Sequence, residues 1–514
     1  MTRETLMKPT LLRGLLVAGL ASAAASSLTA QMATSASPTS VITPDAIYQH
    51  LSVIADDSMM GRDTPSPGLE MTAQYIADRF ASLGLEPGGE NGTWFQRYPI
   101  YQVKIDTENS HVGFMFDGTD THVSLATEAA HWFGPTSAEK VHGPVVLIGG
   151  MLDAGEIKKL DLKGKVVLLV FDFAKLPQRQ YQVALAALRS FGPAAVVAVS
   201  NRSDTKFASR LELQTRPRTV LQAQAHGGTP GVEVRQSALA DLAVAAGLNF
   251  EKIRTADGLV TKDLPALTVD VDLKHVVLQQ ASAPNTIGIL EGSDPTLKNE
   301  YVVYSAHMDH IGIRSGRADS ISNGADDDAS GTVGVLMLAE AFAKAETRPS
   351  RSILFITVSG EEKGLWGSAH FAEHPTVPVH DMVANINIDM IGRNSPDSIV
   401  AIGKEHSDLG KTLNRVNAAH PELAMTAIDD IWPDERFYFR SDHYNFARKG
   451  VPVLFFFNGV HDDYHQVSDE IDKIDTEKMS RIISLLYYLG KDIADAPERP
   501  QWNPESYKQI VEGA

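Results

Sequence analysis

Apolar residues recur at two spacings along this chain, and each spacing predicts one kind of secondary structure. In the N-terminal part the spacing is helical, with apolar positions three or four residues apart. It predicts a helix that starts after a Thr43 cap and runs through Ile54, and a second helix from Pro67 to Leu83. We expect Met71, Tyr75, Ile76 and Phe80 to share one face of the second helix.

From about residue 284 onwards, compact apolar runs alternate with amphipathic stretches. The runs predict strands and the amphipathic stretches predict helices. The predicted strands are 300–305, 352–358, 381–388 and 451–457, and the predicted helices are 332–344, 365–373 and 478–493. This alternation predicts the α/β fold class, as a three-layer sandwich with a largely parallel mixed sheet.

A different pattern fills the segment 126–282. Its apolar runs at 144–148, 165–171, 194–199 and 264–269 predict buried strands, with one helix near 182–191. The ligand-type residues described below resume only near residue 300, so we interpret this segment as an inserted, smaller β-rich domain with its own core. The alternative is that the segment belongs to one larger sheet.

The predicted division of the chain follows from these patterns. It comprises a signal peptide at 1–30, an N-terminal part of the main domain at 31–125, the inserted domain at 126–282, the catalytic domain at 283–496 and a surface-bound tail at 497–514. A length of 514 residues agrees with two or more domains.

The first thirty residues have the pattern of a secretory signal. Lys8 and Arg13 precede the apolar run 15–25, and small residues follow through Ala30. We expect cleavage near Ala30, a secreted or periplasmic location, and no stable membrane span after cleavage. An uncleaved anchor is the alternative, although the run is short for a membrane helix.

Composition narrows the partners and the chemistry. The formal net charge is -18, which argues against nucleic acid as a partner, because a phosphate backbone requires a basic face. The chain has no cysteine, so any bound metal must use histidine, aspartate and glutamate side chains.

Side chains of these types follow the ends of the predicted strands. His307 and Asp309 come after one strand, Glu361 and Glu362 after the next, and Asp389 ends a third. A further histidine, His465, lies beyond the last strand. Because ligands gather at the carboxyl ends of strands in open α/β sheets, we expect these residues to converge. Histidine nitrogens and carboxylate oxygens are the usual ligands of zinc-type metals.

Two groups of neighbouring acids fit such a centre. Asp326, Asp327 and Asp328 crowd three charges into one loop before a predicted helix. Helix capping explains one of these acids, and a cation would compensate the others. Glu361 and Glu362 are adjacent and must point in different directions, so one can bind metal while the other faces the substrate.

Five motifs in order resemble the M28 family of dinuclear zinc aminopeptidases. They are 305–312, 324–331, 359–368, 387–392 and the pair Tyr464–His465, within about 285–480. The inserted segment resembles a protease-associated (PA) domain, through a less specific match.

The resemblance implies a role for each matched residue. One of two Zn²⁺ ions would be held by His307, Asp327 and Asp389, and the other by Asp327, Glu362 and His465. Glu361 would be the general base, Asp309 would orient His307, and Tyr464 would steady the oxyanion. The resemblance also implies a cis peptide bond between Asp327 and Asp328.

The resulting expectation is a secreted zinc aminopeptidase that acts on peptides with a free N-terminus. It would use a metal-activated water, with Glu361 as general base. A carboxypeptidase, a glutaminyl cyclase and a non-catalytic peptide-binding protein stay open as alternatives on the same scaffold. A serine mechanism at Ser441, Asp442 and His443 is disfavoured, because the groups of a triad converge in space and adjacent residues do not provide that.

Overall fold

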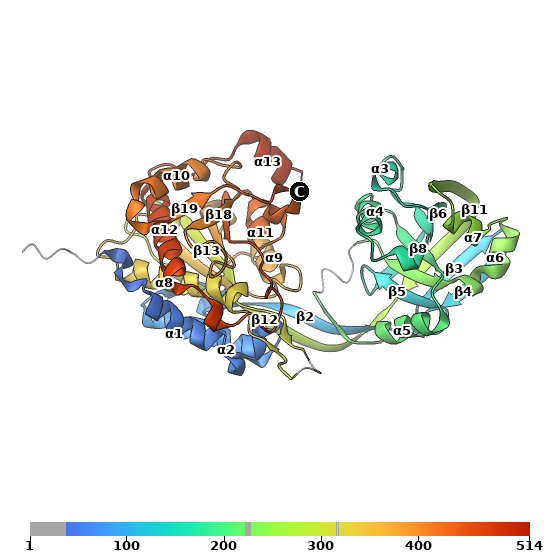
Figure 1. Cartoon of the computed structure of the whole chain (residues 1–514), viewed down its shortest axis with the longest axis horizontal. Helices are drawn as coiled ribbons and strands as arrows, with labels where there is room; N and C mark the ends of the chain where they lie inside the picture. The colour runs from blue at the N-terminus through green and yellow to red at the C-terminus, as the bar shows by residue number, and fades with distance from the viewer. Residues whose placement is uncertain (1–36, 222–227, 315, 317, 514) are drawn as a thin grey trace, which may run out of the picture. The chain divides into compact units, whose positions relative to one another are not determined.

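The structure is a computed structural model that describes residues 37–221, 228–314, 316 and 318–513 (Figure 1). The predicted signal peptide lies outside the described residues. Within the described ranges, no helix combines the length and the apolar character needed to cross a membrane.

Among the described residues, the first sheet has ten strands and a parallel centre. Its order is β19-β18-β20-β17-β13-β16-β12-β2-β9, and β1 pairs with β12. The four central strands β20, β17, β13 and β16 pair in parallel, whereas β12 and β18 flank them in antiparallel register. The bounds are Glu86–Pro87 (β1), Phe95–Ile105 (β2), Arg218–Val220 (β9), His275–Leu290 (β12), Tyr301–His307 (β13), Ser352–Val358 (β16), Met382–Ile388 (β17), Ser398–Ile402 (β18), Thr426–Ile428 (β19) and Val453–Phe457 (β20).

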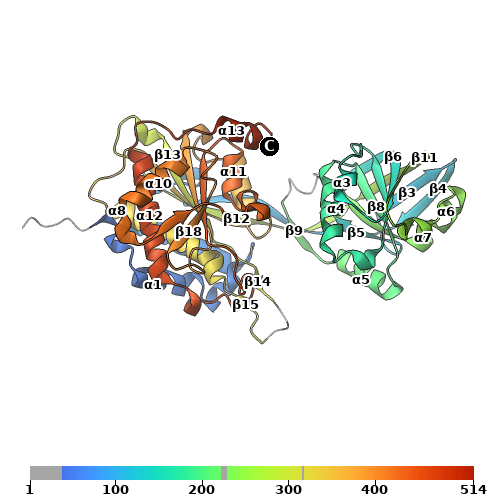
Figure 2. The same ribbon diagram turned by 45° about the horizontal axis from the view of Figure 1, so that its top comes forward.

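Helices cover both faces of this sheet and make it the middle of three layers (Figure 2). Alternate residues of β13 enter different cores: Val302 and Tyr304 pack on one face, and Val303 packs on the other. The first core includes residues of α1 (Pro44–Ile54), α2 (Pro67–Ser82), α8 (Gly331–Lys344), α10 (Leu409–Ala419) and α12 (Thr476–Asp495). The second includes residues of α9 (Trp366–Glu373), α11 (His443–Ala447) and α13 (Pro504–Ile510). The α/β fold class is therefore confirmed.

The second sheet has eight strands in the described part of the chain, in the order β4-β3-β11-β6-β7-β8-β10-β5. It has its own apolar clusters on its two faces, so it is separate from the first sheet. The strand bounds are His111–Phe116 (β3), Thr119–Ser124 (β4), Ala129–Phe133 (β5), Ala138–Gly150 (β6), Val166–Val170 (β7), Ala195–Ser200 (β8), Gly231–Arg235 (β10) and Leu259–Leu273 (β11). Its helices are α3 (Ala154–Ile157), α4 (Arg179–Ser190), α5 (Asp204–Gln214), α6 (Ala240–Ala245) and α7 (Phe250–Arg254).

The second sheet is an insertion in the order of the chain. The strands of the second sheet lie between β2 and β12 in chain order, and they are interrupted once by β9, which pairs with β2 of the first sheet. Because β3 and β4 pair in the second sheet, that sheet begins before residue 126, where the sequence pattern places the boundary. The domain boundaries and the likeness to a PA domain stay predictions.

Two details differ from the sequence-based expectations. Met71 is 45% exposed, whereas Ile76 and Phe80 are buried, so Met71 does not share their buried face of α2. The tail contains a helix, α13, which begins at Pro504 and buries Ile510. One buried apolar side chain in a seven-residue helix gives too weak a period for the sequence pattern to predict.

Candidate metal centre

The parallel strands of the first sheet bring the predicted site residues to one edge. His307 is the last residue of β13, Asp389 directly follows β17, and Glu361 and Glu362 follow β16 after two residues. His465 lies in the loop after β20. Because these four strands are neighbours and run in the same direction, their carboxyl ends meet at the same edge.

Asp327 lies at the centre of the converging side chains. One of its carboxylate oxygens, Oδ1, is 3.4 Å from His307 Nε2, and the other, Oδ2, is 3.2 Å from His465 Nε2. His307 Nε2 is also 3.7 Å from Asp389 Oδ1, and His465 Nε2 is 3.1 Å from Glu362 Oε2. The five residues that the sequence predicts as ligands therefore form two groups that share Asp327.

Three consecutive aspartates have three different sets of partners. Asp326 accepts a hydrogen bond from the Gly392 N–H and contacts His461. Asp328 accepts three backbone N–H groups, from His307, Gly331 and Met390. Only the middle acid faces both His307 and His465, and the peptide bond between Asp327 and Asp328 is cis.

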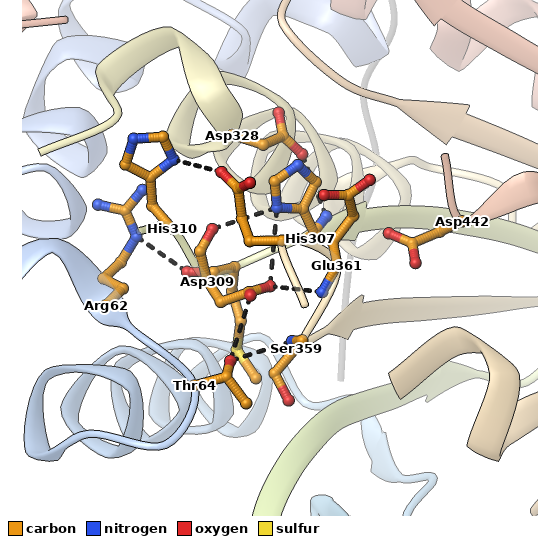
Figure 3. Close-up of polar contacts among 12 residues, drawn as sticks. Arg62, Thr64, His307, Asp309, His310, Asp328, Ser359, Glu361 and Asp442 are labelled. Atoms are coloured by element: carbon orange, nitrogen blue, oxygen red, sulfur yellow. Dashed lines mark hydrogen bonds and ion pairs between the residues drawn. The ribbon is translucent and has the colours of Figure 1, made fainter. Parts of the chain in front are cut away.

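Asp309 contacts His307 chiefly through its backbone. The His307 Nδ1 atom is 3.1 Å from the Asp309 carbonyl oxygen, whereas the nearest carboxylate oxygen is 3.7 Å away. The Asp309 carboxylate accepts hydrogen bonds from the Thr64 hydroxyl and from the Glu361 N–H (Figure 3). Asp309 thus joins the first histidine to the segment that carries Glu361.

The two adjacent glutamates point in different directions. Glu361 lines a cleft together with His307, Asp327 and Asp389, whereas Glu362 contacts His465. Burial raises the pKa of the Glu361 carboxyl well above its ordinary value; His307 opposes this shift, and the nearby carboxylate of Asp442 adds to it.

Histidines hold Asp327 in its charged form. Burial alone would raise the pKa of this carboxyl, but His307, His310 and His465 outweigh burial and hold the pKa well below its ordinary value. The neighbouring carboxylates raise the pKa of His465. Partial burial alone would lower this pKa, but Asp327 and Glu362 outweigh burial and raise the pKa to about 10.

Two residues beside the ligands have contacts that the sequence does not predict. His310 is fully buried, and its Nδ1 atom lies 2.9 Å from Glu362 Oε1. The hydroxyl of Ser441 donates a hydrogen bond of 3.0 Å to Asp389 Oδ2. His310 is three residues from His307, and that proximity was the only signal in the sequence.

Ser441, Asp442 and His443 have separate partners. Ser441 donates to Asp389, Asp442 accepts from Ser368, and the His443 ring stacks on Phe455. Burial lowers the pKa of His443 to about 3, so the ring is neutral at ordinary pH. These contacts agree with the expectation that the three residues do not form a serine-protease triad.

Aromatic and apolar side chains form the other wall of the cleft. Phe437, Phe455, Phe457 and Val460 line it, and Tyr464 lies beside them. The Tyr464 ring stacks on His465 at a centroid distance of 3.9 Å. The cleft therefore joins a carboxylate-rich side to an apolar side.

The residues present fit a pair of zinc ions. The donor set consists of histidine nitrogens and carboxylate oxygens, which zinc prefers. Asp327 Oδ2 and Glu362 Oε1 are buried, and the histidine nitrogens beside them, at 3.2 and 2.9 Å, do not form hydrogen bonds of good geometry with them. Buried carboxylate oxygens without well-formed hydrogen bonds are costly, and a bound cation would compensate that cost.

Comparisons with known proteins found a peptidase family and aminopeptidases among the similar sequences. Residues 285–490 match the model of Peptidase family M28. The chain is 27% identical over 238 residues to Aminopeptidase YwaD of Bacillus subtilis (strain 168), which covers 44% of this chain and 48% of that protein. It is 27% identical over 210 residues to a probable leucine aminopeptidase of Arthroderma otae, covering 39% of this chain and 56% of that protein. The chain spans about half the length of these curated relatives.

Among solved structures, one that matches the chain is the aminopeptidase from Aneurinibacillus sp. strain AM-1. Its TM-score to this chain is 0.49, with 18% sequence identity, and the alignment covers 91% of this chain and 97% of that one.

Proposed function

Residues 285–490 belong to peptidase family M28, and from this premise we propose that the chain is a dinuclear zinc aminopeptidase that removes residues from the N-terminus of peptides. The observation that carries the proposal is the meeting of five ligand-type side chains from separate parts of the chain. Their contacts at 3.1, 3.2, 3.4 and 3.7 Å form two groups that share one aspartate.

Each group would hold one ion. His307, Asp327 and Asp389 would bind the first, and Asp327, Glu362 and His465 would bind the second. When bound, such a pair of ions supplies Lewis acidity, which polarises a peptide carbonyl and makes a water more acidic. The carboxylates around the ions, among them Glu361 in the cleft, would attract the positively charged α-amine of a peptide, which favours an aminopeptidase over a carboxypeptidase.

Glu361 would move the proton. Its side chain lines the cleft beside His307 and Asp389, so it can accept a proton from the attacking water and pass it to the leaving amine. Asp309 fixes both the His307 ring and the Glu361 backbone through its hydrogen bonds. Tyr464, which lines the same cleft, would donate its hydroxyl hydrogen to the carbonyl oxygen as negative charge develops there.

Replacing the proposed base tests this mechanism. We expect Glu361→Gln to lose about a thousandfold or more in kcat on aminoacyl-nitroanilides while it keeps its zinc, because the amide cannot accept the proton. Glu373→Gln is the matched control, since Glu373 pairs with Lys449 away from the cleft. A zinc-loaded Glu361→Gln protein with wild-type turnover would refute the role, and cleavage of N-acetylated peptides from their C-terminus would indicate a carboxypeptidase.

Export and the identity of the inserted segment are further parts of the proposal. The apolar run 15–25, with basic residues before it and small residues after it, supports a secreted or periplasmic protein. N-terminal sequencing of the protein recovered from culture medium or periplasm should give a start near residue 31. A retained Met1 in that fraction would contradict cleavage.

For the inserted segment, we propose a PA-like domain on the basis of its small β-rich sheet.

A further inference from the structure

Two buried side chains that precede the family match at 285–490 contact segments of the candidate metal centre. Arg62 and Thr64 lie more than two hundred residues before residue 285, where the family match begins. Arg62 is fully buried and Thr64 is 1% exposed. Both side chains point at segments that carry the proposed ligands and base (Figure 3).

Arg62 binds backbone carbonyl groups on two separate ligand segments. Its Nε donates 2.8 Å to the Met308 carbonyl, which lies between His307 and Asp309. Its Nη1 and Nη2 atoms donate 2.6 and 3.0 Å to the carbonyls of Asn323 and Gly324, just before the three aspartates. One guanidinium group therefore fixes the distance between the segment of His307 and the segment of Asp327.

Gly61, next to Arg62, lets the backbone of this segment lie close to the backbone of Gly312. A Cβ atom at position 61 would lie 2.9 Å from the Gly312 carbonyl oxygen, and Gly61 has a φ of +63°. Position 61 therefore requires glycine for two reasons: its φ is positive, and a side chain would have no space. The carbonyl of Arg62 in turn accepts the N–H of His310.

A guanidinium group is hard to replace here. Arginine offers five donors in a planar fork, whereas lysine offers one compact charge with three donors. Arg62 also makes a fourth bond, from Nη1 to the Ile54 carbonyl at 2.9 Å. Lysine at this position would leave several of these buried carbonyls without a donor, and the two ligand segments would no longer be tied together.

Thr64 forms hydrogen bonds that hold the segment carrying Glu361, the proposed base. Its hydroxyl donates 3.2 Å to Asp309 Oδ2 and accepts the Gly360 N–H at 3.0 Å. The other carboxylate oxygen of Asp309 accepts the Glu361 N–H at 3.2 Å. The Thr64 hydroxyl and the Asp309 carboxylate therefore hold two consecutive N–H groups, including that of the base itself.

We propose that Arg62 and Thr64 are positioning residues of the centre: Arg62 sets the spacing of the metal-ligand segments, and Thr64 sets the position of the backbone that carries Glu361. The part that concerns Thr64 rests on the proposed function. The part that concerns Arg62 requires only that the site binds zinc.

Zinc affinity tests Arg62. The dissociation constant of each variant would be measured by competition with a chromophoric chelator, and the absorption spectrum of the Co²⁺-loaded protein would report ligand geometry. We expect Arg62→Lys to bind zinc at least about tenfold more weakly and to shift the Co²⁺ spectrum. The matched control is Arg351→Lys: Arg351 is equally buried and donates to the Ile493 carbonyl, and it precedes β16, at the opposite end of that strand from Glu361.

Steady-state kinetics test Thr64. We expect Thr64→Val to lose about tenfold in kcat with KM within twofold of wild type and zinc affinity unchanged, because a small displacement of a base lowers the rate of the chemical step. Thr64→Ser should restore kcat, since it keeps the hydroxyl. Thr72→Val is the control, because Thr72 is buried and its hydroxyl donates to the Gly68 carbonyl within α2.

The outcomes separate the inference from the proposed function. Arg62→Lys with the zinc affinity and Co²⁺ spectrum of Arg351→Lys would overturn the role of Arg62. Thr64→Val with the kcat of Thr72→Val, or a kcat that serine does not restore, would overturn the role of Thr64. If Arg62→Lys does not fold, Thr64→Val and Thr64→Ser still decide the inference. A wild-type protein that binds zinc and cleaves no peptide would refute the proposed function, and zinc affinity would then decide the inference through Arg62 alone.

Discussion

At the scale of single residues, side chains that are neighbours in sequence have different partners. Asp326 contacts His461, and Asp327 contacts the proposed ligands His307 and His465. Asp328 accepts three backbone N–H groups. The protonation of these neighbours differs too: histidines hold the pKa of Asp327 well below its ordinary value, whereas burial and the nearby carboxylate of Asp389 raise the pKa of Asp328 well above its ordinary value. A substitution in this loop should therefore have an effect that depends on the position and not on the charge removed.

Ser441 gives a prediction at this scale. Its hydroxyl donates to Asp389 Oδ2, and hydrogen bonds to a ligating carboxylate fix the ligand's orientation. We expect Ser441→Ala to weaken zinc binding by about tenfold without loss of fold. Ser484→Ala is the control, because Ser484 is buried in α12 and bonds to the Ser480 carbonyl. Equal zinc affinity in the two variants would exclude this role for Ser441.

The sequence predicts the proposed ligands better than it predicts the residues that hold those ligands in position. His307, Glu362 and Asp389 stand at strand ends, and a strand end is visible as the last residue of an apolar run. The contacts of Arg62 and Ser441 depend on where distant carbonyl groups and carboxylates lie after folding. No spacing in the sequence carries that information, and the same reason hides the contact between His310 and Glu362.

At the scale of elements, α12 packs closely on β13. The Tyr304 hydroxyl donates to the Leu486 carbonyl, and a Cβ atom at position 490 would overlap the Tyr304 ring, with Cζ at 2.6 Å. We expect Gly490→Ala to lower the free energy of unfolding by about 1–3 kcal/mol, because the overpacking outweighs the better helix propensity of alanine. Chemical denaturation compared with Ser484→Ala in the same helix measures this. A variant as stable as wild type would contradict the packing described here.

The pair of helices α1 and α2 makes stability sensitive to pH. His50 of α1 is buried and bonds to the Tyr75 hydroxyl of α2, and burial lowers its pKa from 6.5 to about 4. The unfolded chain therefore binds this proton more readily, and the free energy of unfolding falls as pH drops from 6.5 towards 4. A shift of this size corresponds to about 3 kcal/mol.

His50→Gln removes that titration. We expect its free energy of unfolding to fall by less than that of wild type between pH 7 and pH 4, as measured by urea denaturation at each pH. Parallel pH profiles for the two proteins would show that His50 is not the group responsible.

The elements with clear periods could be predicted from the sequence, and the rest could not. The strand Ser352–Val358 has the predicted bounds, and α1 starts at the predicted Thr43 cap. The edge strands β18 and β19 and the helix α13 are short. A short segment has few apolar positions, so its structure depends on the surface that it covers and not on its own period.

At the scale of the whole molecule, two sheets with separate apolar clusters should unfold as separate units. We expect two transitions in calorimetry. Added zinc should raise the midpoint temperature of only the transition that belongs to the first sheet, because four of the five proposed ligands lie at or after the ends of its strands and the fifth, Asp327, contacts His307 and His465. Wild type with chelator and wild type with zinc give the comparison. A single transition, or an equal shift of both transitions, would contradict this independence.

The central claim is that scattered side chains hold a pair of metal ions around Asp327, and elemental analysis of the purified protein tests it most directly. The account predicts two zinc ions per chain in the wild type and fewer in His465→Ala, in which the second group loses its histidine. A wild-type protein that takes up no zinc, or a His465→Ala variant with unchanged zinc content, would contradict it.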